Sequence, residues 1–128
     1  MKRPRVLIVD DSSVMRKIIE RSLRQAGLDL GEVVEAGNGI EALSAIRGGV
    51  FDLILSDINM PGMDGIEFLR QLVTLEEGKG IPVVMVTTEG SETRVVEALS
   101  IGAKGYIRKP FTPDQIKERV SPLLEVMR

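Results

Sequence analysis

The run Val6-Leu7-Ile8-Val9 ends in two carboxylates, Asp10 and Asp11, and this pattern of an apolar run followed by a reactive side chain decides the fold. The pattern recurs three times: residues 53–55 precede Asp57, residues 83–86 precede Thr87, and residues 106–107 precede Lys109. Continuous aliphatic runs are typical of strands that helices cover on both faces. The runs are therefore predicted to be strands of a parallel sheet.

Helical patterns separate the predicted strands. Each begins at a residue that favours the N-cap position, and these residues are Ser12 or Ser13, Asn38, Asp64, Ser91 and Thr112. Pro122 lies inside the last pattern, which extends to Met127, and its missing N–H predicts a kink or an end of that helix. Residues 76–80 are polar and predict an open loop before the fourth strand.

Five strands alternating with five helices predict an α/β doubly wound sheet. The strands are expected near residues 5–9, 32–36, 53–56, 83–87 and 105–108. Right-handed crossovers send the loops that follow the strands to one edge, where such sheets bind their ligands. Asp10, Asp11, Asp57, Thr87 and Lys109 are expected to meet at that edge.

Composition limits the chemistry that the chain can perform. From its 128 residues we expect one domain over residues 1–128, with no output domain. The absence of cysteine and histidine excludes disulfides, thiolate sites and imidazole ligands, so any metal must be held by oxygen. A net charge of −2 gives no general attraction to nucleic acid, and no stretch is long enough to span a bilayer. We expect a cytoplasmic protein.

The clustering of carboxylates suggests a bound cation. Asp10, Asp11 and Asp57 would repel one another unless a cation lay among them, and hard oxygen ligands favour Mg²⁺, with Mn²⁺ as a substitute. Lys109 adds a positive charge for transferring phosphoryl oxygens, and the Thr87 hydroxyl adds a hydrogen-bond donor. Two other carboxylates, Asp52 and Asp64, are assigned to structural roles.

Four motifs in this order resemble the receiver domains of two-component response regulators, and most closely the stand-alone chemotaxis regulators of the CheY type. The motifs are Val9-Asp10-Asp11-Ser12, the segment 56–65 (SDINMPGMDG), Val86-Thr87-Thr88-Glu89 and Lys109-Pro110-Phe111. The resemblance covers essentially the whole chain. It implies a flavodoxin-like (βα)5 fold whose five parallel strands lie in the order 2-1-3-4-5.

The resemblance also implies roles for individual residues. Asp57 would accept the phosphoryl group, and Mg²⁺ would be held by Asp10, Asp11, Asp57 and the backbone carbonyl of Asn59. Lys109, aimed into the site by a cis Lys109–Pro110 bond, and Thr87 would contact the phosphoryl group. Thr87 and Tyr106 would act as the switch, and Asn59 and Glu89 would tune hydrolysis. The chain would thus be no enzyme in the usual sense, but a phosphoacceptor that assists its own phosphorylation and dephosphorylation.

Partners follow from the same resemblance. A sensor histidine kinase would donate the phosphoryl group. A monomeric receiver would then present the face formed by its fourth helix, fifth strand and fifth helix to a flagellar switch protein or to a histidine phosphotransfer domain. No binding to nucleic acid and no insertion into a membrane are expected.

Three other functions fit the sequence less well. A phosphatase of the haloacid dehalogenase type needs an acid two residues after its nucleophilic aspartate, where this chain has Asn59. Residues 37–42 (GNGIEA) match the dinucleotide fingerprint G-x-G-x-x-A and open a helix after a strand, but the fingerprint belongs after the first strand, which here ends in acidic residues that would repel a pyrophosphate. An interaction module that has lost phosphorylation would lack one of the reactive residues, and all are present.

Overall fold

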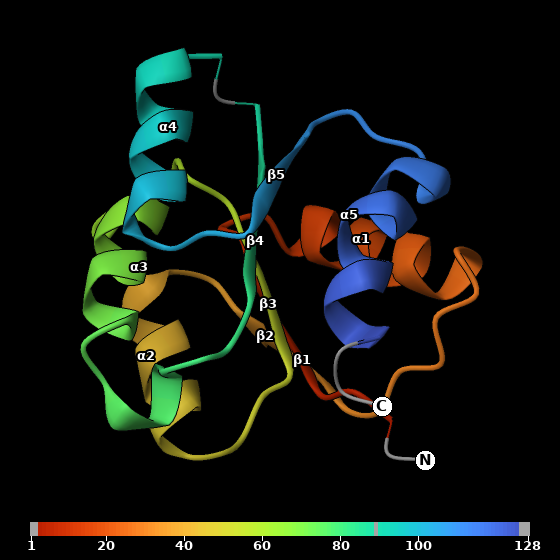
Figure 1. Cartoon of the computed structure of the whole chain (residues 1–128), viewed down its shortest axis with the longest axis horizontal. Coiled ribbons are helices and arrows are strands. Elements are labelled where there is room, and N and C mark those ends of the chain that lie inside the picture. The colour runs from red at the N-terminus through yellow and green to blue at the C-terminus, as the bar shows by residue number, and fades with distance from the viewer. Residues whose placement is uncertain (1–2, 89, 126–128) are drawn as a thin grey trace.

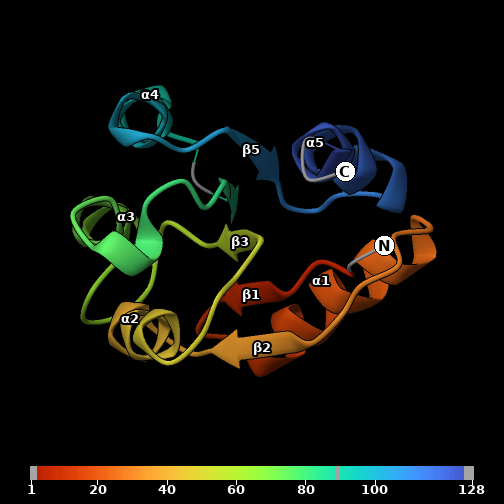
Figure 2. The same ribbon diagram turned by 60° about the horizontal axis from the view of Figure 1, so that its bottom comes forward.

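The computed structural model describes residues 3–88 and 90–125, and it forms a five-stranded parallel sheet between two layers of helices (Figures 1 and 2). The strands are β1 (Val6–Val9), β2 (Val33–Ala36), β3 (Leu53–Ser56), β4 (Val83–Thr87) and β5 (Gly105–Arg108). Their order is β2-β1-β3-β4-β5, which confirms the expected order. The predicted strands are confirmed to within one residue at each end.

Helices α2, α3 and α4 cover one face of the sheet, and α1 and α5 cover the other (Figure 1). The bounds are α1 (Ser13–Gln25), α2 (Gly39–Arg47), α3 (Gly65–Leu72), α4 (Glu92–Ile101) and α5 (Pro113–Glu125). No helix within the described ranges is long and apolar enough to cross a membrane. Every residue of β1, β3 and β4 is buried, as their continuous aliphatic sequences predict.

The predicted caps form at four helix starts. The side chains of Ser12, Asn38 and Asp64 each accept a hydrogen bond from a backbone N–H in the first turn of α1, α2 and α3. Thr112 and Gln115 make a reciprocal pair before α5: the Gln115 amide donates to the Thr112 hydroxyl at 3.2 Å, and the Thr112 amide donates to the Gln115 side chain at 2.9 Å. These caps fix where each chain segment leaves the edge of the sheet.

Two expectations about irregular segments need correction. The segment 76–80 is not an open loop, because Glu76–Gly78 form the 3-10 helix η1, in which Gly78 is buried. Pro122 does not end α5, which continues through it to Glu125. Proline removes the bond to the carbonyl of Glu118, but both residues are exposed, so water can replace the missing N–H. Met127 lies outside the described residues.

Candidate functional site

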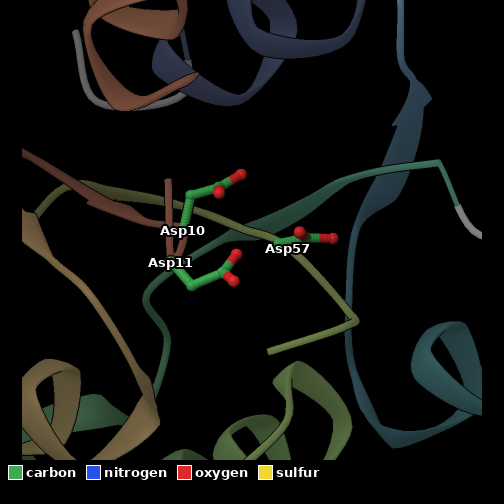
Figure 3. A group of neighbouring side chains, drawn as sticks. All are labelled: Asp10, Asp11 and Asp57. Atoms are coloured by element: carbon green, nitrogen blue, oxygen red, sulfur yellow. The ribbon is translucent and has the colours of Figure 1, made fainter. Parts of the chain in front are cut away.

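The carboxyl ends of four strands bring the predicted site residues together. Asp10 and Asp11 follow β1, Asp57 follows the neighbouring β3, Thr87 ends β4, and Lys109 follows β5. One carboxylate oxygen from each aspartate lies within 4.8 Å of the other two. Figure 3 shows the three aspartates as neighbours at this edge of the sheet. The convergence predicted from the shared edge of the parallel strands is therefore present for the three aspartates and Lys109, and Thr87 ends the strand between those of Asp57 and Lys109.

The members of this cluster differ in burial. Asp10 and Asp57 expose only 1% and 7% of their surface, and Thr87 is fully buried. Asp11 is exposed. The cluster therefore combines two buried carboxylates with one exposed carboxylate, that of Asp11, which solvent can reach.

Lys109 connects the two buried carboxylates. Its Nζ donates to Oδ2 of Asp10 at 2.7 Å and to Oδ2 of Asp57 at 3.2 Å. Burial tends to lower the pKa of the Lys109 ammonium, but the hydrogen bond to Asp10 and the charges of Asp57 and Asp10 outweigh burial, so this pKa is raised. The Lys109–Pro110 peptide bond is cis, as the resemblance implied. Lys109 therefore remains a cation inside the site at neutral pH.

Asp57 is held from several sides. Its Oδ1 accepts a hydrogen bond from the Asn59 amide at 3.3 Å, and its backbone carbonyl accepts one from the Ser56 hydroxyl at 3.0 Å. The start of α3 packs directly on the same backbone: a Cβ at Gly65 would lie 1.9 Å from the Asp57 carbonyl oxygen. Only glycine fits there, and this role of Gly65 was not predicted from the sequence.

The turn from β1 into α1 holds the first aspartate. The Ser12 amide donates to Oδ1 of Asp10 at 2.9 Å, and Nη1 of Arg16 donates to the Asp10 backbone carbonyl at 2.6 Å. Sequence reasoning missed Arg16, although its position one turn into α1 was a signal that its side chain could reach back to the turn.

The charges and donors of this site suit a divalent cation. Three carboxylates face one ammonium, so negative charge is in excess. The available ligands are oxygens, which Mg²⁺ prefers over nitrogen and sulfur. The acidic cluster could therefore bind a metal ion. Asn59 is exposed, and its amide contact with Asp57 places its backbone beside the cluster.

The remaining predicted residues lie in different surroundings. Tyr106 belongs to β5 and exposes 39% of its surface. Glu89 lies outside the described residues. Asp52 and Asp64 have the structural roles expected of them, because Asp52 accepts the Arg5 amide at 2.8 Å and Asp64 caps α3. Their carboxylates are not part of the acidic cluster.

Gly37 and Gly39, the glycines of the dinucleotide fingerprint, also have a structural explanation. Gly39 begins α2, and a Cβ added to it would lie 2.7 Å from the sulfur of Met63, which comes from the loop after β3. The Gly37 amide donates to the Glu41 side chain at 3.0 Å as part of the turn into α2. Packing and capping therefore account for both glycines.

Comparisons with known proteins agree with this geometry. Residues 6–121 match the response regulator receiver domain family. Chemotaxis protein CheY-3 of Vibrio cholerae is 41% identical over 97% of this chain and 94% of its own length, and chemotaxis protein CheY of Pseudomonas aeruginosa is 42% identical over 94% and 96%. The structure of CheY4 of Vibrio cholerae superposes with a TM-score of 0.84 at 36% identity, covering 95% of this chain and 99% of that one. The chain therefore belongs to the response regulator receiver domain family and is a CheY-like receiver of two-component phosphorelay signalling.

Proposed function

We propose that Asp57 accepts a phosphoryl group from a histidine kinase and that the phosphorylated chain signals through a changed binding surface. The observation that carries this proposal is the position of Asp57, whose carboxylate lies within reach of Lys109 and within the same cluster as Asp10 and Asp11. Among these three aspartates, Asp57 follows the central strand β3, which lies between β1, the strand before Asp10 and Asp11, and β4, the strand that ends in Thr87.

The proposed transfer forms one O–P bond and breaks one N–P bond. An oxygen of Asp57 attacks the phosphorus of a phosphohistidine, the N–P bond breaks, and the imidazole leaves. A bound Mg²⁺, held by Asp10, Asp11, Asp57 and the Asn59 carbonyl, would offset the repulsion between the anionic nucleophile and the anionic donor. The imidazole leaving group needs little acid assistance, which fits a site with Asn59 where a phosphatase has an acid.

Lys109 and Thr87 bind the group that Asp57 receives. The Lys109 ammonium already lies 3.2 Å from Oδ2 of Asp57, so it is close to any phosphoryl oxygen attached there. Thr87 is buried at the end of β4, and its hydroxyl donates to a second phosphoryl oxygen in our proposal. A move of Thr87 toward the phosphoryl group changes the packing behind it, and Tyr106 in the neighbouring strand β5 responds.

The same site promotes its own dephosphorylation. Asn59 is exposed beside Asp57, on the side from which water can approach the phosphoryl group. Glu89 is given the same role from the sequence alone. Exchange of either residue is expected to change the dephosphorylation rate more than the phosphorylation rate, and equal effects on both rates would contradict this role.

A test of the acceptor uses acetyl phosphate with Mg²⁺ and mass spectrometry of the intact chain. We expect a mass gain of one phosphoryl group that Asp57→Asn abolishes. Asp52→Asn is the matched control, since Asp52 is a partly buried aspartate on the other end of the sheet, and its phosphorylation is expected to match the wild type. No mass gain under any condition, or the same gain in Asp57→Asn, would overturn the proposal.

The output surface is proposed to lie on α4, β5 and α5. Val96 and Leu99 of α4 expose 54% and 40% of their surface, and the half-exposed Tyr106 lies in β5. Because the relatives are chemotaxis proteins, a flagellar switch protein is the first candidate target. A pull-down with phosphorylated and unphosphorylated chain, against a switch-protein peptide and a histidine phosphotransfer domain, separates this target from a relay role. Phosphorylation-dependent binding to neither would contradict both.

A further inference from the structure

The three carboxylates of the acidic cluster are held in different ways. Asp10 accepts hydrogen bonds on both oxygens, from the Ser12 amide and from Lys109. Asp57 does the same, from the Asn59 amide and from Lys109. Within residues 3–88 and 90–125, no hydrogen bond or ion pair involves the carboxylate of Asp11. The position of that carboxylate therefore depends on the backbone that carries it (Figure 3).

The peptide unit between Asp10 and Asp11 has one side-chain anchor. Nη1 of Arg16 donates to the carbonyl oxygen of this peptide at 2.6 Å, while Nε of the same guanidinium donates to Oε1 of Glu35 at 2.8 Å. Glu35 lies in β2, next to β1 in the sheet. The side chains of Arg16 and Glu35 expose only 18% and 23% of their surface. A planar guanidinium held at two points keeps this carbonyl in one orientation.

We infer that Arg16 is a positioning residue for the metal site, which fixes the Asp10–Asp11 peptide and through it the direction of the Asp11 carboxylate. Glu35 holds Arg16 in place for this task. The inference rests on the proposed function, since it concerns the divalent cation that the proposed phosphoryl transfer requires.

Charge and positioning predict opposite effects of removing Arg16. A cation beside a metal site repels Mg²⁺, so removing its charge alone would strengthen Mg²⁺ binding. Removing the anchor of the Asp10–Asp11 peptide frees Asp11 to turn away from the site and weakens Mg²⁺ binding. The sign of the change therefore identifies which role Arg16 has.

Lys17 provides a matched control. It neighbours Arg16 in α1 and pairs with the same carboxylate, because its Nζ lies 2.5 Å from Oε2 of Glu35. Its side chain exposes 66% of its surface, and within the described ranges it makes no hydrogen bond or ion pair with Asp10. Lys17→Met removes a charge and a Glu35 pair as Arg16→Met does, but it leaves the Asp10 carbonyl anchored.

The experiment measures Mg²⁺ affinity by calorimetry for wild type, Arg16→Met, Arg16→Lys and Lys17→Met, each checked for native circular dichroism. We expect about tenfold weaker binding for Arg16→Met, the scale of losing a group that orients a metal ligand. Lys17→Met is expected to stay within about twofold of wild type, since exposed charges are screened. Unchanged or tighter binding by Arg16→Met would overturn the inference.

Two further readouts complete the test. Without metal, the NMR amide signal of Asp11 should move in Arg16→Met and stay in place in Lys17→Met. If Arg16→Met does not fold, Arg16→Lys decides: it keeps the charge, but one ammonium cannot replace a two-point fork, so binding weakens by about threefold. Wild-type affinity in Arg16→Lys would then overturn the inference.

The outcomes also separate this inference from the proposed function. With saturating Mg²⁺, phosphorylation of Arg16→Met by acetyl phosphate should recover to nearly the wild-type rate, because only the metal affinity has changed. If the wild-type chain binds Mg²⁺ and is phosphorylated while Arg16→Met equals it in both, only the role of Arg16 fails. If the wild-type chain binds no Mg²⁺, the proposed function and the role of Arg16 fail together.

Discussion

The two ends of the sheet use the same types of charged residue in different ways. At the end where the strands begin, Arg5 lies over the ring of Phe51, 4.4 Å from its centroid, and donates to Glu32 at 2.7 Å and to the Val50 carbonyl at 3.0 Å. The Arg5 amide also donates to Asp52. At the other end, three carboxylates lie together, and Lys109 pairs with only two of them, Asp10 and Asp57. Charges with matched partners stabilise the first end, whereas excess negative charge prepares the second end for a cation.

The largest effect is expected from removing the cation that pairs with carboxylates at each end, which is Lys109 at one end and Arg5 at the other. Lys109→Met leaves Asp10 and Asp57 buried side by side without their counter-charge, and we expect it to lower the free energy of unfolding by about 3 kcal/mol without metal. Added Mg²⁺ should restore more stability to Lys109→Met than to wild type, because the emptied site binds the cation more tightly. Urea denaturation with and without Mg²⁺ measures both effects.

Arg5→Met is the control for this comparison. Its partner Glu32 is largely exposed, so we expect a loss of about 1 kcal/mol from the cation–π contact and the surface ion pair. This loss should be the same with and without Mg²⁺. A larger loss for Arg5→Met than for Lys109→Met would show that the two ends do not differ as described.

A smaller effect is expected from adding one methyl group at each end. Gly65→Ala places its Cβ against the Asp57 backbone, which cannot move without displacing the site, and we expect it to destabilise the fold by about 2 kcal/mol and to impair phosphorylation. At the other end, the Cβ of Gly49→Ala would lie 2.3 Å from Nη1 of Arg5, a flexible side-chain end that can shift. There we expect a loss below about 1 kcal/mol and normal phosphorylation.

Thermal unfolding and acetyl phosphate labelling of the two glycine variants test this pair. Alanine favours a helix more than glycine does, so any destabilisation by Gly65→Ala must come from the contact with Asp57. Wild-type stability in Gly65→Ala would mean that α3 can move away from the site at little cost.

The comparison of the two ends also shows how much the sequence could predict. The five strands and the convergence of Asp10, Asp11, Asp57, Thr87 and Lys109 were predictable, because continuous aliphatic runs mark buried parallel strands whose carboxyl ends share one edge. The strand order came from the family resemblance, since periodicity does not specify which strands are neighbours.

The contacts of Arg16 and Gly65 were not predictable in this way. Each depends on how closely two segments approach in space: α1 to the turn after β1, and the start of α3 to the backbone of Asp57. The position of Arg16 one turn into α1 allows its contact, but no local pattern specifies that either approach occurs. Pro122 is the opposite case, because a strong local rule predicted a kink or an end, and the end does not occur: α5 continues to Glu125, with Val120 and Leu124 buried on either side of the proline.

An effect confined to alkaline pH is expected from Lys109. Its pKa is raised in the folded chain, so its contribution to stability is complete below the unfolded value near 10.5 and is lost as the pH rises through the folded pKa. The difference in unfolding free energy between wild type and Lys109→Met should therefore be constant at neutral pH and shrink only in alkaline solution. A difference that shrinks below pH 9 or so would contradict the raised pKa.

The smallest effect is expected at the start of α3, where Asp64 pairs with Arg94 at 3.1 Å. Asp64→Asn keeps the cap on α3, because an amide oxygen also accepts the Glu67 N–H, and loses only the ion pair. The two side chains expose 35% and 36% of their surface, so solvent screening limits the loss to about 0.5 kcal/mol.

The pH dependence of this small loss distinguishes the ion pair from the cap. Burial alone would raise the pKa of the Asp64 carboxyl, but hydrogen bonds from the Glu67 amide and Arg94 outweigh it, and the pKa is lowered. The stabilisation is therefore present at neutral pH and is lost as the pH falls through the folded pKa. Urea denaturation of wild type and Asp64→Asn should give equal stabilities in strong acid, and at neutral pH their difference should shrink in about 1 M salt. A difference that persists in acid, where Asp64 is protonated, would show that it does not come from the ionised carboxylate, and that the Asp64–Arg94 pair does not share the matched-charge character of the Arg5 end.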